Sequence, residues 1–142
     1  MKIYFACSIM GGRQDETAYR HIVQAMLDDG HEVPTAGNAG IVGTGHTGLE
    51  PDMDPVAVYS RDTGWIDESD TLIAEVSTPS HGVGYEIGYA LEHQRPVLCI
   101  FRKGVRVSKM ITGNTMPGLQ VAEYANEREA IEVVRNFLAN LS

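Results

Sequence analysis

Residues 60–90 read SRDTGWIDESDTLIAEVSTPSHGVGYEIGYA, and this stretch decides the fold. Its centre, residues 71–76, is a short and mostly apolar run that predicts a strand. A helix is predicted before it, over residues 55–69, and another after it, over residues 83–93. A helix that leads into a strand, then a loop and a second helix, is the repeating pattern of a parallel α/β sheet.

The same alternation extends in both directions along the chain. Further strands are predicted at residues 2–6, 31–35, 96–101 and 119–124, and further helices at residues 15–29 and 126–141. We expect one domain over residues 1–142, with a five-stranded parallel sheet between helices in a flavodoxin/Rossmann-like three-layer sandwich. Short, right-handed connections favour the strand order 2-1-3-4-5.

This strand order predicts where a ligand binds. The strands at residues 2–6 and 71–76 are neighbours in it, and the chain leaves them in opposite directions. The loops that follow them, at residues 7–13 and 77–84, then flank one crevice at the carboxyl edge of the sheet, where ligands bind in this architecture. The Gly-rich segment 36–54 is predicted to be a lid over that crevice, with a disordered loop as the alternative.

Composition narrows the function classes. The 142 residues carry a net charge of −8 with no run of Lys or Arg, so we expect no nucleic-acid partner. A small phosphate ester remains possible, because helix N-termini and loop amides bind phosphate without nearby cations. No apolar run is long enough to cross a bilayer, and the spacing of Cys7 and Cys99 matches no metal or disulfide pattern. We therefore expect a soluble, cytoplasmic protein with reduced thiols.

The first loop, CSIMGGR at residues 7–13, lies between a strand and a helix. Its glycines let the backbone approach a ligand closely, Ser8 adds a hydroxyl, and the following helix N-terminus offers free amides to an anion. A tight turn without a ligand explains the same glycines, so this signal is weak when taken alone.

Glu86 is the candidate nucleophile. We expect it in or near the first turn of the helix that follows the loop at residues 77–84, where the helix dipole favours an ionised carboxylate. An ionised carboxylate at the mouth of a crevice can attack an electrophilic carbon. The alternative is a Glu that only stabilises the helix N-terminus.

Asp62 is the candidate general acid. Together with Val58, Trp65 and Ile66 it follows a helical spacing that places a carboxyl on an apolar face, where burial favours the protonated form. A pair with Arg61 on that face is not expected. A distant Arg13 or Arg95 that neutralises Asp62 is the structural alternative.

One ionised and one protonated carboxyl across a pocket are the groups that cleave a glycosidic bond. At a separation of about 5–5.5 Å the reaction is a double displacement in which Glu86 attacks C1′. Tyr4 can hydrogen-bond Glu86 and orient it, or it is only a core aromatic. His46 and His81 lack partners at a metal spacing, so we expect no metal, and we expect no other cofactor. No G-x-S-x-G motif follows a strand, so Ser-His-Asp catalysis is not expected either.

Three segments together resemble a known family: IYFACSIMGGRQDETAY, the stretch at residues 60–90, and VSKMITG. They are similar to the 2′-deoxynucleoside 5′-phosphate N-hydrolases of the nucleoside 2-deoxyribosyltransferase-like superfamily. The resemblance implies that Glu86 is the nucleophile, Asp62 the acid/base and Tyr4 the residue that supports the nucleophile. It also implies a homodimer in which the Ser108 segment completes the neighbouring site.

The resemblance implies a substrate-binding set as well. The residues expected to hold the 5′-phosphate or another part of the nucleotide are Ser8, Ile9, Gly11, Gly12, Arg13, Ser80, Gly82, Ser108 and Met110. Many members have Arg where this chain has Met10, so base preference is left open. The competing functions are a nucleoside deoxyribosyltransferase, for which a phosphate site has no use, and a nucleotide-binding module, which places no demand on Asp62.

Overall fold

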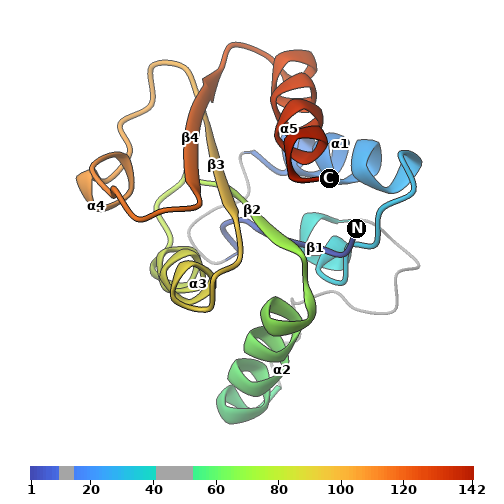
Figure 1. Cartoon of the computed structure of the whole chain (residues 1–142), viewed down its shortest axis with the longest axis vertical. Coiled ribbons are helices and arrows are strands. Elements are labelled where there is room, and N and C mark those ends of the chain that lie inside the picture. The colour runs from blue at the N-terminus through green and yellow to red at the C-terminus, as the bar shows by residue number, and fades with distance from the viewer. Residues whose placement is uncertain (10–14, 41–52) are drawn as a thin grey trace.

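A computed structural model describes residues 1–9, 15–40 and 53–142 (Figure 1). The elements, in chain order, are β1 (Ile3–Ala6), α1 (Glu16–Asp28), η1 (Ala36–Ala39), α2 (Pro55–Glu68), β2 (Thr71–Glu75), α3 (His81–Glu92), β3 (Val97–Arg102), α4 (Lys109–Thr112), β4 (Leu119–Tyr124) and α5 (Glu127–Leu141). The short helix α4 lies within a segment for which the sequence predicts no regular structure.

The sheet has four parallel strands in the order β1-β2-β3-β4. The prediction of five strands in the order 2-1-3-4-5 is therefore wrong. The expected strand at residues 31–35 is reduced to a single parallel bridge between Lys2 and Glu32. Residues 2–6 and 71–76, which were predicted to be neighbours, do pair, with Tyr4 opposite Leu72.

The missing strand has a local cause. Pro34 has no N–H to donate to a sheet, and the hydroxyl of Thr35 replaces the backbone of a neighbouring strand. This hydroxyl accepts from Phe5 N–H at 3.0 Å and donates to the Phe5 carbonyl at 2.8 Å. The chain then turns into η1 instead of continuing along β1.

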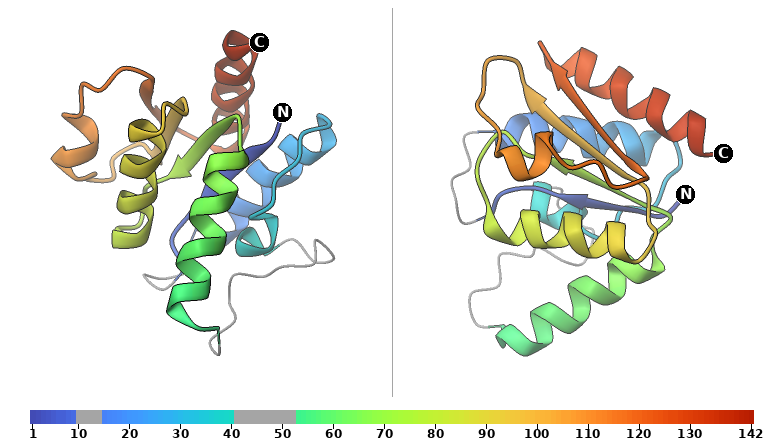
Figure 2. Two further views of the ribbon diagram at one scale, coloured as in Figure 1. Left: turned by 60° about the horizontal axis from the view of Figure 1, so that its bottom comes forward. Right: turned by 60° about the vertical axis from the view of Figure 1, so that its left-hand side comes forward.

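Helices cover both faces of the sheet, with α1 and α5 on one face and α2 and α3 on the other (Figures 1 and 2). Alternate strand residues point to opposite faces. Ile3 and Phe5 join the core under α1 and α5, whereas Tyr4 and Ala6 join the core under α2 and α3. Cys7 and Cys99 are buried thiols in these two separate cores. Among the described residues, no helix is long and apolar enough to cross a bilayer.

Candidate active site

The start of α1 and the loop after β2 meet at the carboxyl edge of the sheet. Thr78, in the β2–α3 loop, donates through its hydroxyl to Asp15 Oδ2 at 3.0 Å. Asp15 stands at the start of α1, and its Oδ1 lies 2.8 Å from Nε of Arg102 at the end of β3. The end of the first connection, the β2–α3 loop and the end of β3 are thus tied together.

A buried carboxyl that the sequence analysis did not single out fixes the β2–α3 loop. Glu75 is fully buried, and it accepts from Ser77 N–H at 2.5 Å and from the Tyr124 hydroxyl at 2.7 Å. The Ser77 hydroxyl accepts in turn from the backbone N–H of Arg102 at 2.8 Å. Burial raises the pKa of Glu75. This network holds the strand end from which the chain enters α3.

Ser80 begins α3 as its N-cap, and its Oγ accepts from Val83 N–H at 3.3 Å. Capping uses a lone pair of the hydroxyl and leaves its proton available to a ligand oxygen. Gly82 follows in the first turn, and an added Cβ there would lie 3.8 Å from Ser80 Oγ. The glycine therefore keeps the space beside this hydroxyl open.

Ser8 lies at the end of β1, on the other side of the same edge. Its side chain is fully buried, and its Oγ has no hydrogen-bond partner within the described part of the chain. A buried hydroxyl without a partner is costly unless a ligand or water satisfies it. Ile9 is partly buried beside it. The predicted contributions of Gly11, Gly12 and Arg13, and most of the predicted lid, lie outside the described residues.

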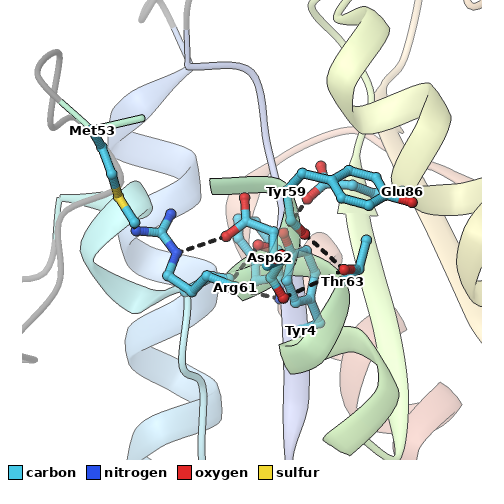
Figure 3. Close-up of polar contacts among 10 residues, drawn as sticks. Tyr4, Met53, Tyr59, Arg61, Asp62, Thr63 and Glu86 are labelled. Carbon is cyan, nitrogen blue, oxygen red and sulfur yellow. Dashed lines mark hydrogen bonds and ion pairs between the residues drawn. The ribbon is translucent and has the colours of Figure 1, made fainter. Parts of the chain in front are cut away.

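Tyr4 and Glu86 are brought together by β1 and α3. Tyr4 is 1% exposed, and its hydroxyl donates to Glu86 Oε2 (Figure 3). The predicted hydrogen bond between Tyr4 and Glu86 is therefore present, whereas the orienting role of Tyr4 and the catalytic role of the pair stay predictions. Burial, together with the nearby carboxylates Glu86 and Asp62, raises the pKa of Tyr4, so the phenol stays protonated and acts as a donor.

The expected electrostatics of Glu86 are corrected by the structure. Glu86 is the sixth residue of α3, beyond the first turn, where the helix dipole has its main effect. Burial is the dominant cause and raises the pKa of Glu86 to about 7. The Tyr4 hydrogen bond opposes this rise, and the negative charge of Asp62 adds to it. Near neutral pH both protonation states of Glu86 are therefore populated.

Asp62 lies on α2 and pairs with its neighbour Arg61, contrary to the sequence-based expectation. Arg61 Nε donates to Asp62 Oδ1 at 2.9 Å (Figure 3). The pair forms because the long Arg61 side chain folds over Trp65, with its guanidinium carbon 4.8 Å from the ring centroid. The proposed alternative partner Arg95 instead donates to the Asp67 carbonyl at 2.6 Å. The other alternative, Arg13, is not among the described residues.

Ser108 and Met110 are not part of this cluster in the single chain. Ser108 is the exposed N-cap of α4, and its Oγ accepts from Met110 N–H at 3.2 Å. Met110 is 82% exposed. The short helix α4 lies on the β4 side of the sheet, away from β1 (Figure 1).

The part of the chain that the structure describes contains no group of three or more His, Cys, Asp or Glu side chains arranged to hold a metal ion. The described site contains one carboxyl, Glu86, held by a phenol and a second carboxyl, Asp62, held by a guanidinium.

Comparisons with known proteins agree on a family. The model of the nucleoside 2-deoxyribosyltransferase family matches residues 3–129. A Nematostella vectensis protein named as a 2′-deoxynucleoside 5′-phosphate N-hydrolase is 39% identical, covering 99% of this chain and 95% of its own. A 5-hydroxymethyl-dUMP N-hydrolase from Tetraodon nigroviridis is 38% identical, with 99% of both chains covered.

Solved structures share the fold at lower identity. A Clostridium botulinum CMP N-glycosidase superposes with a TM-score of 0.72 at 19% identity, covering 96% of this chain and 99% of the other. A 2-deoxyribosyltransferase from Bacillus psychrosaccharolyticus has a TM-score of 0.63 at 21% identity, covering 92% and 90% of the two chains. At these identities the likeness supports the fold alone.

Proposed function

Because this chain belongs to the 2′-deoxynucleoside 5′-phosphate N-hydrolases of the nucleoside 2-deoxyribosyltransferase family, we propose that it hydrolyses the N-glycosidic bond of (2′-deoxy)nucleoside 5′-monophosphates. The products are free base and (deoxy)ribose 5-phosphate. The observation that carries the proposal is the half-buried Glu86, held by Tyr4 and electrostatically coupled to Asp62.

The proposed reaction has two displacements. The single proton of the carboxyl pair moves from Glu86 to Asp62. In the first displacement ionised Glu86 attacks C1′ while Asp62 gives this proton to the departing base, which breaks the glycosidic bond and forms a glycosyl ester on Glu86. In the second, Asp62 takes a proton from water as that water attacks C1′ and releases Glu86. Tyr4 keeps Glu86 oriented throughout by its hydrogen bond.

The phosphate subsite is proposed at the edge where Ser8 and Ser80 lie. The buried, unpartnered Ser8 hydroxyl and the N-terminus of α3 with Ser80 and Gly82 supply donors for a phosphate. Ile9, Gly11, Gly12 and Arg13 complete the proposed set on the first loop.

We further propose a homodimer with shared sites. Ser108 and Met110 are exposed in one chain and lie away from Tyr4, so in this proposal they serve the neighbouring subunit. The exposed aromatic side chains of Tyr59 and Tyr85 add apolar surface suited to such an interface.

The test is a panel of ribo- and deoxyribonucleoside 5′-monophosphates beside the matching unphosphorylated nucleosides, with free base quantified by chromatography. Base released from monophosphates alone, with water as the acceptor, is the expected result. Transfer of the sugar from a nucleoside to an added base would support the deoxyribosyltransferase instead. Binding of a monophosphate without any release would support a nucleotide-binding module.

The pH profile tests the state of Glu86. Burial and the negative charge of Asp62 raise the pKa of Glu86 to about 7, so the pair of carboxyls loses its last proton near that pH. Because the reaction needs this proton on Asp62, kcat/KM should reach half of its plateau near pH 7 and fall tenfold per pH unit well above pH 7. In Tyr4→Phe the limb should move to higher pH, because the hydrogen bond that lowers the Glu86 pKa is lost. A wild-type profile that is flat from pH 5.5 to 8 would contradict this assignment.

Ser80→Ala tests the phosphate subsite. We expect KM for the monophosphate to rise about tenfold, the effect of losing one charge-assisted hydrogen bond, with kcat little changed. The substitution also removes a helix cap, so Asn126→Ala, which removes the corresponding cap of α5 on the opposite face of the sheet from α3, is the matched control. Equal KM changes in both variants would show that Ser80 acts only on stability.

A further inference from the structure

Arg61 is a cationic residue of α2 whose side chain is mostly buried, which is unusual for an arginine on a helix. Its side chain is only 16% exposed, and it is enclosed by Asp62, Trp65 and Met53, whose Sδ lies 3.0 Å from Nη1. A mostly buried guanidinium is costly unless it is paired. The pairing partner is Asp62, the proposed acid/base in the middle of α2, and this pairing offsets the cost.

The geometry fixes one edge of the Asp62 carboxyl and leaves the other open. Arg61 Nε donates to Oδ1 at 2.9 Å, and this is the one hydrogen bond that the Asp62 side chain makes within the described residues. Asp62 remains 22% exposed. Oδ2 is therefore available to a bound base while the carboxyl plane is held by Oδ1.

Packing against Trp65 restricts the Arg61 side chain that holds Asp62. The indole packs against the core under α2 and α3, and the guanidinium lies over it at 4.8 Å. A planar guanidinium can stack on a ring and direct Nε to a carboxylate at once, which a lysine ammonium cannot do. The direction of the hydrogen bond to Asp62 is thus set by the core.

We propose that Arg61 is a positioning residue for the acid/base Asp62, a role that rests on the function proposed above. It orients the carboxyl and compensates the negative charge that Asp62 carries after giving its proton to the base. Glu86 has its own support in Tyr4. The two carboxyls are therefore supported independently, and loss of Arg61 affects the steps in which Asp62 gives or takes a proton but not the attack of Glu86 on C1′.

A substrate whose leaving group needs no proton distinguishes the role of Arg61, which supports Asp62, from the role of Tyr4, which supports Glu86. The variants are Arg61→Met and Arg61→Lys, assayed on a nucleoside 5′-monophosphate and on the p-nitrophenyl glycoside of 2-deoxyribose 5-phosphate, whose leaving group departs as an anion without protonation. The parameter compared between substrates is kcat/KM, which reports steps up to glycosidic cleavage. Arg128→Met, on the exposed face of α5, is the control.

For Arg61→Met we expect kcat on the monophosphate to fall about 10- to 100-fold with KM within threefold of wild type. On the p-nitrophenyl substrate kcat/KM should stay within threefold, whereas Tyr4→Phe should lose activity on both. Arg61→Lys should show the same split with a smaller loss, which keeps the test decisive if the methionine variant folds poorly. Wild-type rates in both Arg61 variants, or equal losses on both substrates, would overturn the proposal. A wild-type protein that releases no base would instead overturn the proposed function.

Discussion

Glu86→Gln is expected to reduce base release from every nucleoside 5′-monophosphate by at least about 10³-fold. The amide keeps the volume of the carboxyl and an oxygen that accepts from the Tyr4 hydroxyl, so the packing of α3 against β1 is retained. It has no negative charge with which to attack C1′. The covalent route is eliminated rather than slowed, and no other described carboxyl is held at this position.

The measurement is single-turnover release of free base, with substrate affinity determined separately by calorimetry. Affinity should change little, because Glu86 contributes to the reaction more than to binding. Glu92→Gln, an exposed carboxyl at the end of the same helix, serves as the control for removal of one negative charge from α3. A Glu86→Gln enzyme with more than a tenth of the wild-type rate would refute the nucleophile assignment.

The pattern of apolar residues correctly predicts four of the five expected strands. It wrongly predicts the strand at residues 31–35, where only a single bridge forms. The pattern records which residues are apolar, but it does not record that a hydroxyl can take the place of a strand. Thr35 satisfies both backbone groups of Phe5, so no fifth strand is needed there. A side chain that takes the place of a strand is recognised only from the structure, where residues 31–35 lie beside β1.

In the candidate active site, too, the sequence predicts some side-chain contacts and misses others. The contact between Tyr4 and Glu86 followed from their positions on adjacent elements, and it is confirmed. The pair of Arg61 with Asp62 was wrongly excluded, because a long side chain over Trp65 reaches a neighbour that helical spacing places on another face. Glu75 was missed although an acid inside an apolar strand is itself a signal of a buried network.

Asp62→Asn is expected to lower kcat on nucleoside 5′-monophosphates by about 10²–10⁴-fold, the contribution of a positioned general acid. The amide retains an oxygen that accepts from Arg61 Nε, so the geometry of α2 is preserved. It cannot deliver a proton to the departing base. Binding of the monophosphate should remain near the wild-type affinity.

A second measurement distinguishes loss of the acid from a general disturbance. The negative charge of Asp62 is one cause of the raised pKa of Glu86, and the residual reaction of Asp62→Asn needs only ionised Glu86, so the fall of kcat/KM above pH 7 should be replaced by an acidic limb below pH 7. Asp67→Asn, which removes an exposed carboxyl from the same helix, should change neither the rate nor the pH profile. An Asp62→Asn enzyme with the wild-type rate would assign the acid to another group. A reduced rate that still falls above pH 7 would mean that the proton lost near pH 7 is not shared by Glu86 and Asp62, and the electrostatic coupling of the two carboxyls would have to be abandoned.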